Sequence, residues 1–389
     1  MPKTGRIQSI DFWRGIVLLV IFIDHIPGNP IGPFTPRNFG FSDAAEAFVF
    51  LSGLVLAYVN WPRIADGRVG EVVRRCLKRA GELYLVQVSL SLAAVALFGL
   101  AFAAGGGDAM LHDDNRAAFF EHPSRGLIGV ALLSYQFGYF NILSVYVVLM
   151  LMAAGMFLLV ARNLLLALVV SVAIYLAARS GLMLPSWPVP YTWFLNPFAW
   201  QLLFTLGMIA GSALRAGPVP YSRPLFVAAA GYLVFALLVT KAGFGLLPGL
   251  PGKMWPYLDV EKGILGSARL LHFLALAYVV SQIRLGDLLL KVPGSAAVAG
   301  LGRQSLSIFA AGSILSAVGQ VILAFVQREN ANPLAFDLAG VATVFAGVAT
   351  LVGLARYLTW RQARGVELRP RVPDGLISGS VRGQSSPAS

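Results

Sequence analysis

Residues 7–26 read Ile7-Gln-Ser-Ile-Asp11-Phe-Trp-Arg14-Gly-Ile-Val-Leu-Leu-Val-Ile-Phe-Ile-Asp24-His25-Ile26, a run that is apolar enough to enter a membrane yet carries ionisable side chains. An ionisable residue inside a spanning helix is costly and therefore indicates a functional site. Arg14 and His25 are eleven residues apart. At about 3.6 residues per turn they share one helix face, displaced by about 16 Å along the axis. The run predicts a helix with a cation toward one membrane surface and an imidazole toward the other.

A purely structural role explains part of this pattern. Arg14 can extend to a lipid headgroup with Asp11 as its ion-pair partner, while His25 lies at the far interface. That arrangement accounts for Arg14 but not for the adjacent pair of Asp24 and His25. We therefore favour a functional site.

The composition places the chain in a membrane. Of its 389 residues 57% are hydrophobic and only 12% are charged, whereas soluble domains carry about 25% charged residues. We expect an all-α fold, a polytopic membrane helical bundle, with one transmembrane domain over residues 1–360. The polar segment 361–389 lacks an apolar period and is expected to be a disordered cytoplasmic tail.

The apolar runs predict about ten transmembrane helices. Lys and Arg gather in alternate connections, such as the loop between the second and third helices (61–79), while acids gather in others such as 105–125. This bias predicts that both termini are cytoplasmic. The apolar segment 126–140 is too short to span and is expected to be re-entrant or interfacial on the outer side. The predicted spans lie near 11–27, 43–60, 80–104, 141–160, 164–179, 198–214, 224–241, 266–284, 304–326 and 334–358.

Several classes of protein are disfavoured. The net charge of +12 would suit a nucleic-acid partner in a soluble chain, but here the basic residues lie in short loops, where they act as a topology signal. Cys76 is the single cysteine, so an intramolecular disulfide is excluded. The four histidines are scattered, so we expect neither a metal site nor a permanently bound cofactor.

Carboxylates accompany His25 at the predicted outer end of the bundle. Asp24 precedes it, and Asp43 and Glu46 lie three residues apart at the start of the second predicted helix. That spacing is typical of a capping box, which stabilises a helix start. The alternative is that one of these acids orients the His25 imidazole, as carboxylates do for catalytic histidines.

Arginines gather at the predicted inner end. Arg75 and Arg79 are four residues apart ahead of the third predicted helix, and guanidinium groups suit phosphates because they donate two parallel hydrogen bonds. Topology alone explains most such clusters, but Arg14 extends this one into the membrane. We therefore predict that Arg14, Arg75 and Arg79 bind a phosphate-bearing ligand.

A third set of polar residues lies toward the outer side, where the loops are rich in Trp and Tyr. Asn196, Trp200 and Gln201 stand at the start of the sixth predicted helix and suit a sugar. Arg269 and His272 are three residues apart in the eighth. This pair can receive a carboxylate, or Arg269 can instead pair with Asp43 or Glu46.

These residues resemble a known family. Arg14 and His25 in a first membrane helix are similar to the signature of the transmembrane acyltransferase-3 group. The strings Ile10-Asp-Phe-Trp-Arg-Gly15, Phe22-Ile-Asp-His-Ile-Pro-Gly28 and Phe39-Gly-Phe-Ser-Asp-Ala-Ala-Glu-Ala-Phe-Val-Phe-Leu-Ser-Gly53 resemble the OpgC-type succinyltransferases of osmoregulated periplasmic glucans. The segments 196–201 and 269–272 are similar as well. Gln87 departs from the pattern, since a histidine is expected there in many members.

The resemblance implies a multi-pass protein of the bacterial inner membrane that moves a succinyl group from cytoplasmic acyl-CoA to hydroxyls of a periplasmic glucan. It implies that His25 is catalytic and that Arg14 assists. On this basis we expect His25 to be the general base with Asp24, Asp43 or Glu46 as its orienter, and the inner arginines to bind CoA. Arg269, His272, Trp200, Gln201 and Asn196 are the expected acceptor or substrate residues.

Three questions stay open at this level. The acceptor can be another cell-envelope polysaccharide. Transfer can be direct or can pass through an acyl-histidine. A multi-pass transporter for an anionic substrate would use Arg14 and Arg269 as charge sites, although the chain lacks the paired interrupted helices typical of transporters.

Overall fold

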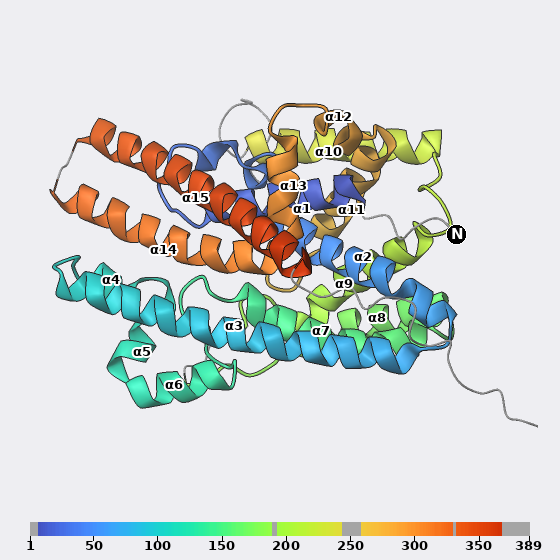
Figure 1. Cartoon of the computed structure of the whole chain (residues 1–389), viewed down its shortest axis with the longest axis horizontal. Helices are drawn as coiled ribbons and strands as arrows, with labels where there is room; N and C mark the ends of the chain where they lie inside the picture. Colours follow the sequence, from blue (N-terminus) through green and yellow to red (C-terminus); the bar gives the residue numbers. More distant parts are fainter. Residues whose placement is uncertain (1–6, 189–192, 243–257, 330–331, 368–389) are drawn as a thin grey trace, which may run out of the picture.

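The fold is a bundle of long helices. A computed structural model describes residues 7–188, 193–242, 258–329 and 332–367. These residues form helices and connecting turns without a strand, and the long helices run mostly along the longest axis of the molecule (Figure 1). The expectation of an all-α membrane protein is therefore confirmed.

Every predicted span contains a helix, but the helices differ in length. Six of those in the described part, α2, α3, α7, α10, α14 and α15, are long and apolar enough to cross a membrane, while α8 and α9 are shorter apolar helices. The total of ten spans and the side on which the termini lie stay predictions. The helices are α1 (Gln8–Asp24), α2 (Ala44–Ala65), α3 (Val69–Ala103), α7 (Ile142–Val160), α8 (Leu164–Arg179), α9 (Pro197–Ala213), α10 (Arg223–Ala242), α11 (Ser267–Gln282), α14 (Ser305–Glu329) and α15 (Pro333–Glu367).

Short helices complete the described chain. The segment predicted to be re-entrant forms α6 followed by irregular backbone up to α7, so it does not span. Phe137 in this irregular stretch is fully buried and packs against Phe98, Phe119 and Phe120. The short elements are η1 (Gly32–Phe34), η2 (Pro36–Asn38), α4 (Ala109–His112), η3 (Asp113–Asn115), α5 (Ala117–Glu121), α6 (Pro123–Ala131), α12 (Leu285–Leu289) and α13 (Ser295–Arg303).

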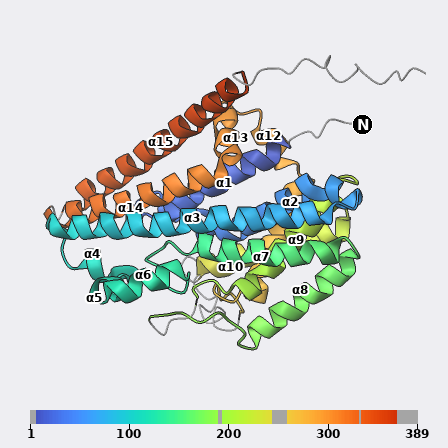
Figure 2. The same ribbon diagram turned by 60° about the horizontal axis from the view of Figure 1, so that its bottom comes forward.

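Helix α1 packs against α2, α13 and α14. A Cβ atom at Gly15 would collide with the carbonyl of Val298 in α13, and one at Gly302 would collide with the carbonyl of Asp11. Glycine therefore permits the two backbones to approach closely at these positions. In the turned view of Figure 2, α14 and α15 lie along one edge of the bundle and α7 and α8 toward the opposite edge.

Helix α3 corrects one sequence expectation. The basic segment expected to be a loop up to residue 79 is already helical from Val69. Val72, Cys76, Ala80 and Leu83 recur at helical spacing and are buried, so an apolar face forms despite the surrounding charges. The prediction of a long loop here is therefore wrong.

Helix α15 corrects a second expectation from the sequence. It continues through residues 361–367, where the sequence predicts a disordered tail. Gln362 exchanges amide hydrogen bonds of 2.8 and 3.2 Å with Gln304, and the Arg364 guanidinium lies 4.2 Å from the centroid of the Trp360 ring. These contacts stabilise the added turns, so the prediction of disorder is wrong at 361–367. Residues 368–389 lie outside the described part.

Candidate active site

His25 stands at the point where α1 ends. Its backbone caps the helix, and its Nδ1 lies 2.6 Å from the carbonyl oxygen of Ile21. Because a carbonyl only accepts, Nδ1 carries the hydrogen and Nε2 is left with a lone pair. The amide of Gln320 in α14 donates to the His25 carbonyl at 2.9 Å, and the Tyr139 ring meets the imidazole edge to face at 5.4 Å. The Ile21 carbonyl thus sets the tautomer, while Tyr139 contacts the ring and Gln320 contacts the His25 backbone.

A narrow crevice of about 20 Å³ adjoins the imidazole. Its walls come from α1 and α14 and from the irregular stretch before α7 that contains Tyr139. Most lining side chains are apolar, but Ser313, Ser316 and Gln320 of α14 also line it. The volume is near that of a single water, so in this conformation the crevice is closed around His25.

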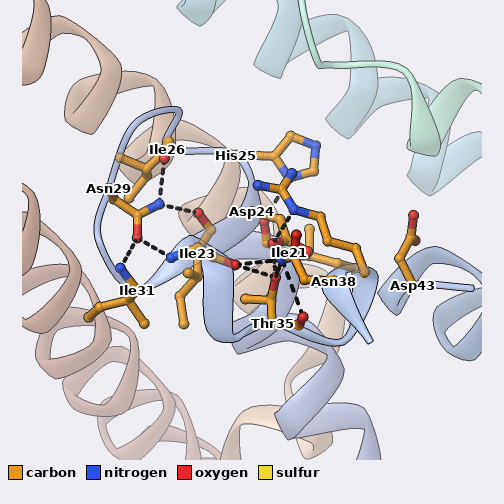
Figure 3. A network of polar contacts seen from close by, with 12 residues as sticks. Ile21, Ile23, Asp24, His25, Ile26, Asn29, Ile31, Thr35, Asn38 and Asp43 are labelled. Atoms are coloured by element: carbon orange, nitrogen blue, oxygen red, sulfur yellow. Dashed lines mark hydrogen bonds and ion pairs between the residues drawn. The ribbon is translucent and has the colours of Figure 1, made fainter. Parts of the chain in front are cut away.

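Asp24 turns away from the imidazole and organises the following loop. Its carboxylate accepts a hydrogen bond from the Thr35 hydroxyl at 2.6 Å and lies 3.3 Å from the Nε of Arg37. Asn29 fixes the same loop by donating to the carbonyls of Ile23 and Ile26 (Figure 3). Asp24 is therefore a positioning residue for the connection between α1 and α2.

Asp43 and Glu46 form the predicted capping box. The Asp43 carboxylate accepts from the backbone of Ala45 at 2.8 Å, and the Glu46 carboxylate accepts from the backbone of Asp43 at 2.8 Å. Arg269 of α11 lies 2.7 Å from Glu46 and 3.4 Å from Asp43, and the Lys262 amine lies 2.6 Å from Asp43. The capping interpretation is confirmed, and so is the alternative in which Arg269 pairs with these acids.

The two cations determine the ionisation of Asp43. Burial of this carboxyl opposes its ionisation, but the charges of Lys262 and Arg269 outweigh burial and lower the pKa of Asp43 to about 2. Asp43 is therefore an anion at any physiological pH and is fully engaged by its partners.

None of the three acids orients His25. Within the described residues, no hydrogen bond or ion pair joins the imidazole to Asp24, Asp43 or Glu46, and in Figure 3 no dashed line reaches Asp43. The expectation of a carboxylate orienter is wrong for this conformation. The reason is local, because Nδ1 of His25 is engaged by the Ile21 carbonyl one turn earlier, which also accepts a hydrogen bond from the His25 backbone.

The residues expected to bind the acceptor have structural partners instead. His272 is buried, its Nδ1 lies 2.7 Å from the Ser42 hydroxyl, and its ring packs against Phe41 at 5.7 Å. Together with Arg269, it fastens α11 to the start of α2. Arg269 is thus already neutralised, which removes the second charge site that the transporter alternative requires.

The start of α9 is equally occupied. Trp200 is fully buried and donates to the Lys262 carbonyl at 3.0 Å, so it presents no face for a sugar to stack on. Asn196 donates to the Leu182 carbonyl at 2.7 Å, and the amide of Gln201 exchanges hydrogen bonds of 2.7 Å with Ser171. In this conformation these side chains hold α8, α9 and the segment before α11 together.

Two of the three predicted inner arginines share a cavity. Arg14 and Arg79 line a space of about 190 Å³ whose remaining walls are mostly apolar side chains of α2, α3, α7 and α14. The guanidinium of Arg14 donates to the hydroxyl of Ser305 at the start of α14, while Arg79 also pairs with Glu82 at 2.9 Å. Arg75 is exposed and does not line this cavity.

Phe309 of α14 borders both spaces. It lines both the cavity of Arg14 and the crevice of His25, and its ring lies 5.6 Å from that of Phe48, which in turn lies 5.5 Å from Tyr146. Leu18 of α1 also lines the crevice. Arg14 and His25 of α1 thus line two neighbouring spaces that share Phe309 as a wall, as expected for residues on one helix face.

Sequence reasoning missed several residues at this site. Phe309 cannot be told from a core aromatic in sequence, since its role depends on which helices meet around it. Gln320 carried a usable signal, because a polar side chain within an otherwise apolar span is uncommon. Arg37 carried a weaker signal as a cation close in sequence to His25.

Among the residues that the structure describes, no cluster of three or more His, Cys, Asp or Glu side chains is arranged to hold a metal ion. His25 at the end of α1 can take part in acid–base chemistry, and the guanidinium of Arg14, about midway along the same helix, can bind an anion.

Comparison with known proteins identifies a family. Residues 6–363 match a family model described as OpgC protein. No curated protein and no solved structure matches the chain. The match does not test the wider acyltransferase-3 grouping, which stays a prediction. The match spans the chain from α1 into α15 and includes the residues that line both cavities. On this ground the chain belongs to the OpgC protein family, and membership of this family implies a membrane acyltransferase that modifies a glucan.

Proposed function

We propose that this protein transfers succinyl groups from cytoplasmic acyl-CoA to hydroxyl groups of a periplasmic glucan across the bacterial inner membrane. The observation that carries the proposal is the placement of Arg14 and His25 in two spaces that share Phe309 as a wall. A donor whose charged end and reactive end lie far apart suits such a pair of spaces. The family match supports the acyltransferase class.

On the donor side, we assign the phosphates of CoA to Arg14 and Arg79. Both guanidinium groups border a cavity with mostly apolar walls, where charge-assisted hydrogen bonds to phosphate are stronger than in water. The pantetheine arm is long and uncharged, so it suits a passage beside Phe309. A movement of that ring is required, since the crevice next to His25 holds only about 20 Å³ in this conformation.

On the acceptor side, we assign the proton transfers to His25. Nε2 takes the proton of a sugar hydroxyl while the hydroxyl oxygen attacks the thioester carbonyl. The carbon–sulfur bond then breaks, and the imidazolium returns the proton to the departing thiolate of CoA. A positioned base of this kind contributes about 10²–10⁴-fold to the rate.

The same nitrogen would serve a covalent route. Because Nδ1 is held by the Ile21 carbonyl, Nε2 is the atom that would carry an acyl group in an acyl-histidine. We favour direct transfer because it needs one acyl transfer instead of two.

The test is the composition of the glucan. Periplasmic glucans from cells that contain the protein should carry succinyl groups, and glucans from cells that lack it should not, as measured by mass spectrometry. Purified protein incubated with succinyl-CoA and unsubstituted glucan should reproduce the modification. Identical glucans in both strains, together with no transfer in vitro, would contradict the proposal and favour another polysaccharide as the acceptor.

A further inference from the structure

We infer that Arg37 receives the free carboxylate of the succinyl donor and thereby selects dicarboxylic acyl groups over neutral ones. The inference rests on the proposed function, because it concerns the acyl group that reaches His25. It replaces Arg269 and His272, which have other partners, as the recognition site for that carboxylate.

Arg37 lies beside the reactive position. It belongs to η2 in the connection between α1 and α2, and its Nε lies 3.3 Å from the carboxylate of Asp24, the residue that precedes His25. Its side chain is 48% exposed. Its positive charge is one contribution to the electrostatic environment of Asp24, His25 and Tyr139. Arg37 thus places a partly exposed cation in the connection that directly follows His25.

The guanidinium has donors to spare. Nε lies 3.3 Å from the Asp24 carboxylate, and among the described residues no hydrogen bond from the terminal nitrogens of Arg37 is found. Two parallel N–H groups of a guanidinium match the two oxygens of a carboxylate. A second carboxylate can therefore bind without displacing Asp24.

Three other cations toward this end of the described structure already have partners. Arg269 lies between Glu46 and Asp43, and Lys262 is 2.6 Å from Asp43. Arg116 is buried under the ring of Phe98, with its guanidinium carbon 4.1 Å from the centroid. Lys262 adds positive charge near His25, but Arg37 is the group with the geometry to hold a carboxylate.

The connection that carries Arg37 is ordered before any ligand binds. The Thr35 hydroxyl bonds to Asp24 at 2.6 Å and to the Gly32 carbonyl at 2.8 Å, and the Asn38 amide also donates to Gly32 at 3.0 Å. A preorganised cation recognises an anion at a smaller entropic cost than a mobile one. The fixed loop therefore suits selection between acyl groups.

The chemistry of the donor fits this position. A succinyl group carries its carboxylate two methylene groups beyond the thioester carbonyl, so a carbonyl held at His25 Nε2 places the carboxylate within reach of neighbouring side chains. A butyryl group has the same chain length and no charge. Arg37 would distinguish the two through one ion pair.

The experiment compares succinyl-CoA and butyryl-CoA as donors to the glucan, using the purified full-length protein. We expect the wild-type protein to prefer succinyl-CoA in kcat/KM, and Arg37→Gln to reduce that preference by about tenfold or more, the effect of one lost charge-assisted contact. Arg37→Lys should give an intermediate ratio, because lysine keeps the positive charge but lacks the two parallel N–H donors of a guanidinium. The matched control is Arg125→Gln, an exposed arginine in α6, which should leave the ratio unchanged.

The outcomes separate this inference from the proposed function. No transfer from either donor by the wild-type protein would overturn the proposed function. If the wild-type protein transfers succinyl groups but Arg37→Gln keeps the same ratio of kcat/KM for the two donors, the inference alone is overturned. The same holds if Arg37→Gln loses activity equally with both donors, and Arg37 is then only a partner of Asp24. If Arg37→Gln does not fold, the ratio in Arg37→Lys decides, and a wild-type ratio there overturns the inference.

Discussion

His25 Nδ1 lies 2.6 Å from the carbonyl oxygen of Ile21, one turn earlier in α1. The helix that carries the imidazole thus also orients it, and no carboxylate is needed to set the tautomer. A carbonyl stays uncharged at every pH, so it keeps Nδ1 protonated without adding negative charge beside the ring. The structure therefore leaves Nε2 as the nitrogen of His25 that can accept a proton.

The first prediction concerns His25 itself. His25→Gln keeps a hydrogen-bond donor and a similar size but cannot take a proton at neutral pH. We expect glucan acylation per mole of monodisperse protein to fall by about 10²-fold or more, as for loss of a positioned base, with CoA binding retained. Near-wild-type turnover would exclude the base mechanism.

The second prediction concerns the partition between the two spaces. Phe309→Trp enlarges the side chain that borders both, so we expect kcat to fall by about tenfold while the dissociation constant of CoA changes little. The control is Phe325→Trp, on the same helix and outside both linings. If Phe309→Trp and Phe325→Trp have the same kcat, the acyl arm does not pass Phe309.

The third prediction separates two arginines of α3. Arg79 lines the cavity of Arg14, whereas Arg75 is exposed and does not. Arg79→Ala should weaken the binding of succinyl-CoA by about tenfold, or about 1.4 kcal/mol, and Arg79→Lys should restore part of the loss. Arg75→Ala should bind as the wild-type protein does, as measured by calorimetry. Equal losses in both alanine variants would mean that positive charge in general attracts the donor, without a defined phosphate site.

The fourth prediction concerns acid stability. The pKa of Asp43 lies at about 2 in the folded protein, below its ordinary value of 3.8. A depressed folded pKa contributes stability that is present above the unfolded pKa and is lost as the pH falls toward 2. The wild-type protein should therefore melt above Asp43→Asn at pH 5, and this difference should shrink between about pH 4 and pH 2.

Differential scanning fluorimetry in detergent at a series of pH values measures this difference. Asp108→Asn changes an exposed aspartate in the turn before α4 and should melt with the wild-type protein throughout. A constant gap between wild type and Asp43→Asn from pH 5 to pH 2 would show that the ion pairs of Asp43 do not stabilise the fold.

The fifth prediction concerns topology. Cys76 is fully buried in α3, so a Cys76→Ser background allows single cysteines to be placed at will. If the loops rich in Lys and Arg are cytoplasmic, Asp108→Cys should react with an impermeant reagent from outside the cell membrane, and Asp66→Cys should react only from inside. The reverse pattern would place His25 on the cytoplasmic side and remove the route from donor to acceptor.

The sequence by itself determined the class of the protein and the features that lie within one helix. Low charge and long apolar runs required a helical membrane protein, because the backbone polar groups must be satisfied inside each span. The shared face of Arg14 and His25 and the capping box of Asp43 and Glu46 also followed, since both depend only on helical periodicity over a few turns.

The tertiary structure decided which distant groups meet. The pairing of Arg269 with Glu46, the contact from Gln320 to His25 and the place of Phe309 between two cavities all join segments far apart in the chain. A lipid-exposed face and a helix-packing face are both apolar, so periodicity does not specify which helices pack together. The same arrangement gives Arg269, His272 and Trp200 partners within the protein and leaves the side chain of Arg37 partly exposed next to Asp24.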